Sequence, residues 1–228
     1  MNSKRGVFIL IEGLDCCGKT TQTKLLHEAL TKMSSAAELL RFPDRTTPTG
    51  KLIDAYLTSK DEQVNDRAIH LLFTANRWEA AEKIEAILNS GKNIVMDRYA
   101  YSGAVFSASK SGMDMNWCWQ PEIGLPRPDA VIFLDLPVDS ASKREDYGAE
   151  RYENVEFQEK VRLNFHKLIE LDHSQKDESR WHFIDANDTI EKVQARVFEV
   201  AQRCIQVSQY TPLASIGPLQ PSSNIPKF

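Results

Sequence analysis

Residues 7–20 read VFILIEGLDCCGKT, and this stretch decides the fold. Its first part, residues 7–11, is a short apolar run rich in β-branched residues, which is typical of a buried strand. Its second part, residues 13–20, matches the pattern G-x-x-x-x-G-K-[S/T], and a helical pattern begins at Lys19. Strand, glycine-rich loop and helix follow one another in the order in which this pattern binds phosphate. The sequence therefore predicts a phosphate-binding loop.

The chemistry of the loop suits an anion. Successive backbone N–H groups and the N-terminus of the next helix attract phosphate, Lys19 adds positive charge, and the Thr20 hydroxyl is suited to hold Mg²⁺. We expect these loop residues to bind the phosphates of a nucleotide: Gly13, Cys16, Cys17, Gly18, Lys19, Thr20 and Thr21. The strand and helix around the loop disfavour a chance match. The chain lacks an Asn-Lys-x-Asp tetrapeptide, which disfavours an ordinary GTPase.

Further apolar runs predict the rest of the sheet. They lack the alternation of a strand with one face in water, and longer segments with helical spacing separate them. The runs are residues 37–42, 93–96, 130–136 and 181–184. Together with residues 7–11 they indicate an α/β fold of the P-loop NTPase type, with a five-stranded parallel sheet and helices on both faces.

The clearest helical spacing covers residues 66–89, and we expect one helix there, ended by Gly91. Residues 156–171 and 189–207 show similar spacing. We expect a single domain over residues 1–207. From residue 208 the chain turns to Ser, Pro and scattered apolar residues, so residues 208–228 are expected to form a surface tail.

Composition excludes several classes of protein. The 228 residues are 42% hydrophobic and 26% charged, with a net charge of −4, so no basic surface favours binding to nucleic acid. No apolar stretch approaches the length of a membrane span, and residues 1–6 are too short for a signal peptide, so we expect a cytoplasmic protein with the nucleus as a second compartment. The 4 cysteines have neither metal-site nor disulfide spacing and are expected to be reduced thiols.

Further motifs carry a resemblance to a known family. They are GLDCCGKTT (13–21), LLRFPDR (39–45), HLLFTANRW (70–78), DRYAYSG (97–103), Pro128-Asp129 and ERYE (150–153). On these motifs the chain resembles the thymidylate kinases, and looks closest to the animal form, over residues 6–207. The resemblance implies transfer of the γ-phosphoryl group of ATP to dTMP in dTTP synthesis. It also implies Mg²⁺ as cofactor and a homodimer.

Phe73 and Arg77 are candidates for reading the base. They are four residues apart, so they project from one face of a helix. An aromatic ring stacks on a base, and a guanidinium, which only donates hydrogen bonds, favours a carbonyl edge. The spacing leaves open a core phenylalanine and a solvated arginine. The resemblance implies that this pair binds the thymine.

Arg45 and Arg98 are candidates for binding the acceptor phosphate. Each follows a predicted strand, at the sheet edge where open α/β folds bind ligands. Each alone is also compatible with a surface charge. Two guanidinium groups that converge on one phosphate bind it firmly and hold it in line for attack. The family's motifs favour this role.

The resemblance implies further contacts to dTMP. Asp15 accepts a hydrogen bond from the sugar 3′-hydroxyl, and Tyr152 lies near the sugar 2′ position and disfavours ribonucleotides. Loop capping is the alternative for Asp15. Other residues match positions that line or brace the acceptor pocket, although each is compatible with plain packing: Phe42, Ser102, Gly103, Phe106 and Gln158.

Asp97 ends an apolar strand, where a carboxylate can organise Mg²⁺ beside Thr20. We expect direct in-line phosphoryl transfer without a covalent intermediate, driven by positioning and charge neutralisation. Lys19, Arg45, Asp97 and Arg98 are expected to act in this step, with Arg151.

Residues 143–153 contain Lys143, Arg144 and Arg151 and are expected to form a mobile lid over ATP; a solvated charge run is the alternative. The resemblance implies that Arg144 lies against the adenine. Animal relatives commonly have arginine at the loop position of Cys16, and this chain does not. The hypothesis is that Arg144, Arg151 or Lys143 supplies the missing charge.

Other functions remain compatible with the sequence. They are a kinase for dUMP, UMP and CMP or a nucleoside, and a catalytically silent nucleotide sensor. The pair Arg45 and Arg98 speaks against a nucleoside acceptor, which has no phosphate. The presence of Lys19, Thr20 and Asp97 speaks against a silent sensor.

Overall fold

The computed structural model describes residues 4–33, 35–59, 63–144, 147–173 and 180–219. One parallel sheet lies at its centre, with the strand order β2-β3-β1-β4-β5. The strands are β1 (Phe8–Gly13), β2 (Ala37–Arg41), β3 (Asn93–Asp97), β4 (Ala130–Asp135) and β5 (Trp181–Asp185). The predicted five-stranded parallel α/β fold is confirmed.

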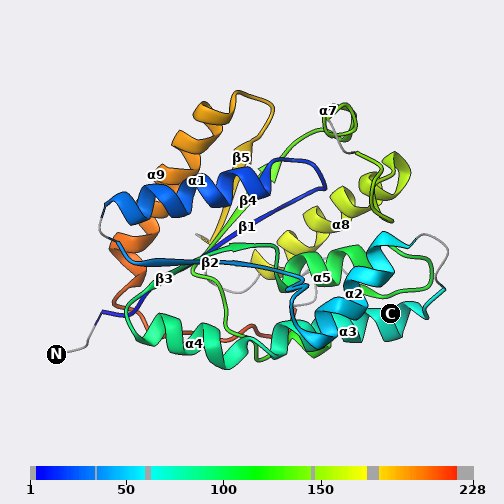
Figure 1. Cartoon of the computed structure of the whole chain (residues 1–228), viewed down its shortest axis with the longest axis horizontal. Helices are drawn as coiled ribbons and strands as arrows, with labels where there is room; N and C mark the ends of the chain where they lie inside the picture. The colour runs from blue at the N-terminus through cyan, green and yellow to red at the C-terminus, as the bar shows by residue number, and fades with distance from the viewer. Residues whose placement is uncertain (1–3, 34, 60–62, 145–146, 174–179, 220–228) are drawn as a thin grey trace, which may run out of the picture.

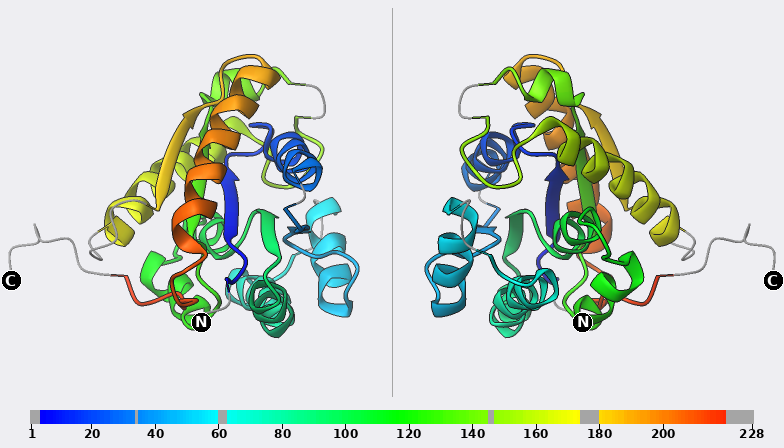
Figure 2. Two further views of the ribbon diagram at one scale, coloured as in Figure 1. Left: turned by 90° about the vertical axis from the view of Figure 1, so that its left-hand side faces the viewer. Right: turned by 90° about the vertical axis from the view of Figure 1, so that its right-hand side faces the viewer.

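The helices cover both faces of this sheet (Figure 1, Figure 2). They are α1 (Lys19–Lys32), α2 (Pro48–Thr58), α3 (Asp66–Trp78), α4 (Ala81–Asn89), α5 (Ala100–Ala108), α6 (Met115–Trp119), α7 (Val138–Ala141), α8 (Val155–His173) and α9 (Ile190–Ser208), with a 3₁₀ turn, η1 (Gln120–Glu122). Within the described ranges, none of the helices is long and apolar enough to span a membrane.

Strand β1 explains why its apolar run shows no alternation with polar residues. Phe8 and Leu10 pack into one cluster with side chains of α4, α5 and α8. Ile9 and Ile11 pack into the other, with side chains of α1 and α9. Because both faces of the strand are covered, residues 8–11 are all apolar, and the strand holds the phosphate loop at its carboxyl end.

The single helix expected over residues 66–89 is wrong. The chain forms α3 and α4, separated where the Ala80 N–H donates to the Arg77 carbonyl at 3.1 Å, one residue short of α-helical spacing. The apolar stripe therefore divides: Phe73 packs on a small cluster with α2, whereas Ile84 packs in the main core. The expected stop is confirmed, because Gly91 has φ 86° and its N–H bonds to Leu88 at the end of α4.

The prediction of a surface tail after residue 207 is also wrong for residues 208–219, the part of this segment that the structure describes. Ile216 is 3% exposed and lies in the main core. Its N–H donates to the Leu125 carbonyl at 2.8 Å, and its carbonyl accepts from the Gly124 N–H at 2.9 Å. Trp119 Nε1 donates to the Gly217 carbonyl at 2.8 Å. The expectation failed because the few apolar residues between Pro212 and Pro218 have no periodicity to reveal which of them is buried. Residues 220–228 lie outside the described ranges.

The docked segment gives a stability prediction. Ile216→Ala leaves a cavity in the main core and should lower the free energy of unfolding by about 2–5 kcal/mol. Val207→Ala, at a position that is 70% exposed, should change it by less than about 0.5 kcal/mol. Denaturant unfolding of both variants measures the difference. Equal losses would show that the segment contributes no core packing.

Candidate active site

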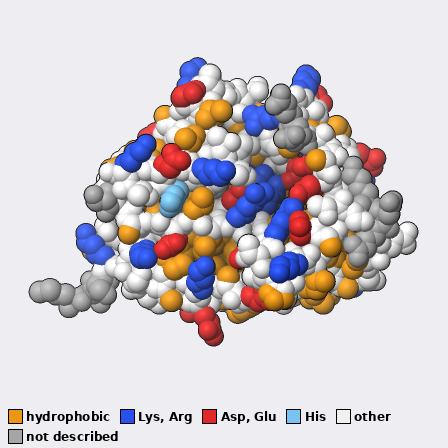
Figure 3. Space-filling model, in the orientation of Figure 1, with side chains coloured by type: hydrophobic (Ala, Val, Ile, Leu, Met, Phe, Trp, Pro, Cys, Tyr) orange, Lys and Arg blue, Asp and Glu red, His pale blue; other side chains and the backbone are white. Residues whose placement is uncertain are grey.

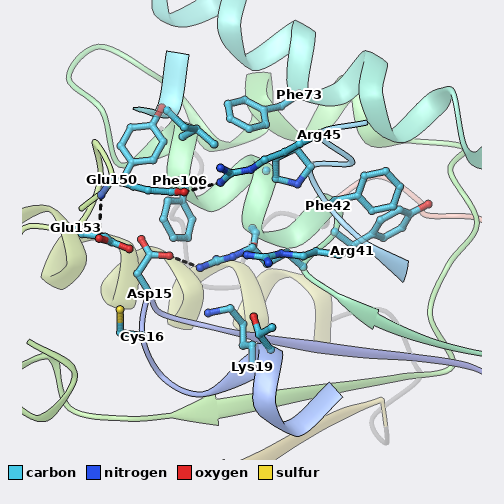
Figure 4. Close-up of a pocket in the computed structure, with 18 of the residues that line it drawn as sticks. Asp15, Cys16, Lys19, Arg41, Phe42, Arg45, Phe73, Phe106, Glu150 and Glu153 are labelled. Carbon is cyan, nitrogen blue, oxygen red and sulfur yellow. Dashed lines mark hydrogen bonds and ion pairs between the residues drawn. The ribbon is translucent and has the colours of Figure 1, made fainter. Parts of the chain in front are cut away.

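A cavity of about 520 Å³ lies at the carboxyl ends of the strands, between the phosphate loop and helices α2, α3 and α5. Charged side chains of both signs gather on this face of the molecule (Figure 3). Their arrangement around the cavity is shown in Figure 4. The charged side chains that line it are Asp15, Lys19, Arg41, Arg45, Arg77, Arg98, Arg144, Glu150 and Glu153. Cations predominate, so the cavity favours an anionic ligand.

The phosphate loop has the backbone that its glycines require. Gly13 and Gly18 have φ values of 147° and 101°, and a Cβ on Gly13 would lie 2.7 Å from the Leu134 carbonyl oxygen. Lys19 Nζ donates to the Leu14 carbonyl and so bends back across the loop. Gly18, Lys19, Thr20 and Thr21 line the cavity. The loop is therefore ready to present N–H groups and one ammonium to an anion.

The two thiols of the loop differ. Cys17 is buried in the core against the sheet, whereas Cys16 lines the cavity with φ 55°, a conformation that costs a non-glycine residue energy. Burial raises the pKa of the Cys16 thiol, and Glu153 and Asp15 raise it further. Cys16 is therefore mainly the thiol at neutral pH, which disfavours ready oxidation.

Thr20 and Asp97 form the part of the site that suits a divalent cation. The Thr20 hydroxyl donates to Asp97 Oδ2 at 2.7 Å, and Arg41 Nε lies 3.7 Å from the same oxygen. Asp97 Oδ1 is buried and has no hydrogen-bond partner among the described residues. Within the described chain, groups of three or more His, Cys, Asp or Glu with metal-site geometry are absent. This donor set fits Mg²⁺, which is commonly bound by one or two protein oxygens together with substrate phosphates.

Arg77 is not a solvated surface charge. It is 2% exposed; its Nε donates to Glu122 Oε2 at 2.8 Å, and its Nη2 pairs with Glu122 Oε1. A Cβ on Gly103 would lie 2.4 Å from Arg77 Nη2, so only glycine leaves room for the guanidinium. Nη1 has no hydrogen-bond partner among the described residues, and Phe73, one turn earlier on α3, lines the same cavity.

Arg98 and Asp15 form an ion pair in the floor of the cavity. Gln158 fixes the carboxylate, since its Nε2 donates to Asp15 Oδ2 at 2.6 Å and its Oε1 accepts from the Asp15 N–H at 3.0 Å. Glu12 holds the start of α5, accepting from the backbone N–H groups of Tyr99 and Ser102 at 3.0 and 3.1 Å. Burial raises the pKa of Glu12.

Arg45 also lines the cavity, held between Asp54 at 2.7 Å and Glu150 at 2.6 Å. Asn76 orders the preceding loop, because its Oδ1 accepts from the Asp44 N–H at 2.8 Å and its Nδ2 donates to the Asp44 carbonyl at 3.2 Å. Arg45, in the loop after β2, thus lines the same cavity as the phosphate loop after β1.

The residues of the expected lid separate into two groups. Arg144 Nη1 donates to the Cys16 carbonyl at 2.7 Å and lines the cavity. Arg151 lies against α2 instead, with its Nε donating to the Tyr56 carbonyl at 3.0 Å, and it is not among the lining residues. Lys143 is exposed and also absent from the lining. Residues 145–146 lie outside the described ranges.

Most predicted site residues meet in this cavity. Those without a place in its lining are Gly13, Cys17, Asp97, Arg151 and Gln158, although Asp97 and Gln158 bond to residues that have one. The lining residues that the sequence reasoning missed are Arg41, Pro43, Leu57, Tyr99, Ser107, Glu150 and Glu153. Glu12 and Glu122, which support the site from behind, were missed too. Glu12 could have been found from the sequence, because it is an acidic residue at the end of an apolar strand. No comparable sequence signal points to Glu122.

Known proteins resemble the chain over nearly its whole length. The family model described as thymidylate kinase matches residues 11–197. The human thymidylate kinase is 42% identical over 95% of this chain and 99% of its own length, and that of Schizosaccharomyces pombe is 48% identical over 86% and 91%. A solved structure of thymidylate kinase from Candida albicans superimposes with a TM-score of 0.84 at 36% identity, covering 95% of this chain and 100% of that one. The predicted P-loop NTPase fold is thereby confirmed.

The pair Arg77–Glu122 gives a prediction about burial. Glu122→Gln leaves a buried guanidinium without its counter-charge and should lower the free energy of unfolding by about 3–5 kcal/mol. Glu150→Gln removes one partner of an arginine that is about one-third exposed and should lower the free energy of unfolding by less than about 1 kcal/mol. Urea unfolding measures both. A small effect of Glu122→Gln would mean that water reaches the Arg77 guanidinium.

Proposed function

Because the chain belongs to the thymidylate kinase family, we propose that its cavity binds dTMP and ATP with their phosphates facing each other. The enzyme phosphorylates dTMP to dTDP with ATP, a step of dTTP synthesis. One observation carries the assignment of residues. A single cavity is lined at one side by Lys19 and Thr20 of the phosphate loop and at the other by Phe73, Arg77 and Arg98.

We assign the thymine to Phe73 and Arg77. The Phe73 ring offers a face for stacking, and Arg77 has donors only, so it suits the O4 carbonyl of thymine better than the amino group of cytosine. Glu122 keeps the guanidinium from moving. A donor already fixed in direction binds its ligand with a smaller loss of entropy.

We assign the acceptor phosphate to Arg45 and Arg98 and the 3′-hydroxyl of the sugar to Asp15. All three side chains line the cavity and carry ion pairs near its surface that a phosphate can exchange. Tyr152 supports the assignment of the 2′ position, since its ring stacks on Phe157 at 5.1 Å and is thereby held rigid. Phe42, Ser102, Gly103 and Phe106 complete the acceptor lining.

Mg²⁺ fits the pair Thr20 and Asp97, because the buried Asp97 Oδ1 offers an anionic oxygen without a protein partner among the described residues. When bound, the ion neutralises charge on the phosphates of ATP. Lys19 binds the phosphate of ATP that moves, and Arg45 and Arg98 hold the acceptor oxygen in line with it. That oxygen is already ionised at neutral pH, so the residues orient and neutralise rather than remove a proton.

Arg144 is our choice for the charge that Cys16 lacks. Its guanidinium already reaches the Cys16 carbonyl, whereas Arg151 bonds to carbonyls of the segment that ends α2. We retain the lid for the described residues 143–144 and 147–153, with Arg144 on the ATP side. Arg151 then holds the lid to α2.

We further propose a single kinase domain over residues 1–207, to which the segment through residue 219 docks. A homodimer is supported by Leu71 and Trp78, apolar side chains that α3 exposes by 47% and 42%. A cytoplasmic location, with the nucleus as a second compartment, is consistent with 4 free cysteines.

A coupled assay with ATP and Mg²⁺ tests the acceptor. dTMP, dUMP, UMP, CMP and thymidine are offered separately, and dTMP should have the highest kcat/KM. Thymidine should not react, since it has no phosphate for Arg45 and Arg98. Faster turnover of UMP or CMP would favour the alternative of a general pyrimidine monophosphate kinase. Nucleotide binding without turnover would favour a sensor.

A second experiment tests the source of charge. Arg144→Ala should lower kcat for dTMP by about 100-fold or more, as expected when one donor to the transferring group is lost. Arg151→Ala, at a residue of the same segment, should leave kcat close to that of the unaltered enzyme. Steady-state kinetics at saturating ATP separates the two. The reverse order of effects would assign the charge to Arg151.

A further inference from the structure

A buried histidine lies behind the end of the cavity that we assign to the base. His70 on α3 is 0% exposed, and its Nδ1 lies 2.8 Å from the Oγ of Ser107 on α5. Ser107 in turn lines the cavity. The histidine therefore contacts a group that faces the ligand, although His70 itself is not in the lining.

Ser107 lies beside the donors of Arg77. It is one helical turn beyond Gly103, whose missing side chain makes room for the Arg77 guanidinium. His70 is likewise one turn before Phe73 on α3. Phe73, Arg77 and Ser107 all line the cavity, and the helical spacing of α3 and α5 brings them toward the end that we assign to the base.

The His70 ring is neutral at pH 7. Burial lowers its pKa to about 4, and Arg77 and Lys110 lower it too, while Glu122 and the backbone of Cys118 act in the opposite direction. A neutral imidazole has one N–H, so one ring nitrogen donates and the other accepts.

The tautomer follows from the groups around the ring. The Cys118 backbone raises the pKa as a hydrogen-bond acceptor, and a carbonyl can only accept. Nε2 is buried and has no partner of normal hydrogen-bond geometry within the described part of the chain. Because Nδ1 already contacts Ser107, we assign the N–H to Nε2, directed toward Cys118, and the lone pair to Nδ1.

This tautomer fixes the polarity of Ser107. Its hydroxyl hydrogen is donated to His70 Nδ1, and its oxygen lone pairs remain for the cavity. A free serine hydroxyl rotates to donate or to accept as the ligand requires. Ser107, held in this way, can only accept from a ligand.

We propose that His70 is a positioning residue that fixes Ser107 as a hydrogen-bond acceptor and thereby makes the base site selective for pyrimidines that carry an N3–H. The proposal rests on the assignment of the base to Phe73 and Arg77. Thymine and uracil present a donor at N3 and an acceptor at position 4, whereas cytosine presents an acceptor at N3 and a donor at position 4. Arg77 and the fixed Ser107 complement the first pattern at both atoms and oppose the second at both.

The fixed orientation of the Ser107 hydroxyl matters because a hydroxyl that can rotate would also allow cytosine to bind. If Ser107 could turn, it would donate to cytosine N3 and recover a hydrogen bond, leaving Arg77 as the sole source of discrimination. Holding the hydroxyl removes that alternative, so two lone pairs face each other when cytosine enters. One neutral hydrogen bond, at about 1.4 kcal/mol, corresponds to about tenfold in selectivity.

The test is the ratio of kcat/KM for dTMP to kcat/KM for dCMP, in a double-mutant cycle. His70→Leu and Ser107→Ala should each lower this ratio about tenfold. The double variant should match Ser107→Ala alone, because His70 acts only through that hydroxyl. His70→Asn, whose amide oxygen can replace the lone pair of Nδ1, should restore most of the ratio. The KM for ATP should stay unchanged in all four variants.

Trp117→Leu is the matched control for packing. The Trp117 ring lies against His70, with ring centroids 5.3 Å apart, and it has no place in the cavity lining. Trp117→Leu should lower the melting temperature and leave the ratio unchanged. A changed ratio in this control, or an effect of His70→Leu that persists in the Ser107→Ala background, would overturn the proposal and assign His70 to packing.

The Arg77→Leu variant separates failure of this inference from failure of the base assignment. If Arg77→Leu lowers the ratio but Ser107→Ala does not, the base lies at Arg77 and the role of Ser107 is refuted. If neither variant changes the ratio, the base lies elsewhere, and the assignment of the base to Arg77 and the role of Ser107 are both refuted. Ser107→Ala removes one oxygen atom from a residue near a helix end, so the cycle stays informative even if His70→Leu does not fold.

Discussion

Charge neutralisation inside one cavity is the constraint on which the rest of the site depends. The cavity gathers a lysine and several arginines from segments that include the phosphate loop, the carboxyl ends of β2 and β3, and α3, and like charges at such distances repel strongly where water is scarce. Each arginine that we assign to dTMP is paired with at least one carboxylate. Arg77 has Glu122, Arg98 has Asp15, and Arg45 has Asp54 and Glu150. The fold therefore carries its own counter-ions to the carboxyl edge of the sheet.

These pairs differ in how easily a ligand can exchange them. Arg77 and Glu122 are both almost fully buried, so separating them would leave two unpaired charges in a medium of low dielectric constant. Arg45 and its partners are about one-third exposed, where water compensates a broken pair. A permanent pair suits an arginine that must keep one direction to read a base. An exchangeable pair suits an arginine that must receive a phosphate.

Local pattern predicted the sheet and the phosphate loop, because buried parallel strands and glycine turns depend on residues close in sequence. What it missed depends on distant partners. The break between α3 and α4 arises because their apolar faces meet different clusters, which a helical period cannot reveal. Ile216 is buried by residues from η1 and its surroundings, far away in the chain. Arg151 was expected to act in phosphoryl transfer, yet a motif does not state which way each side chain points.

The composition of GLDCCGKTT reflects the neighbours of each loop position. Asp15 joins the loop to Arg98, so the elements that we assign to the two substrates are linked by an ion pair. Cys17 fills the core beneath the loop, where a small apolar side chain is needed. At position 16 the side chain carries no charge, and the Arg144 guanidinium donates to the Cys16 carbonyl at 2.7 Å. With Lys19 as its single cation, the loop must then obtain the further charge from another segment. On our proposal, phosphoryl transfer thereby depends on the position of Arg144 as well as on the loop.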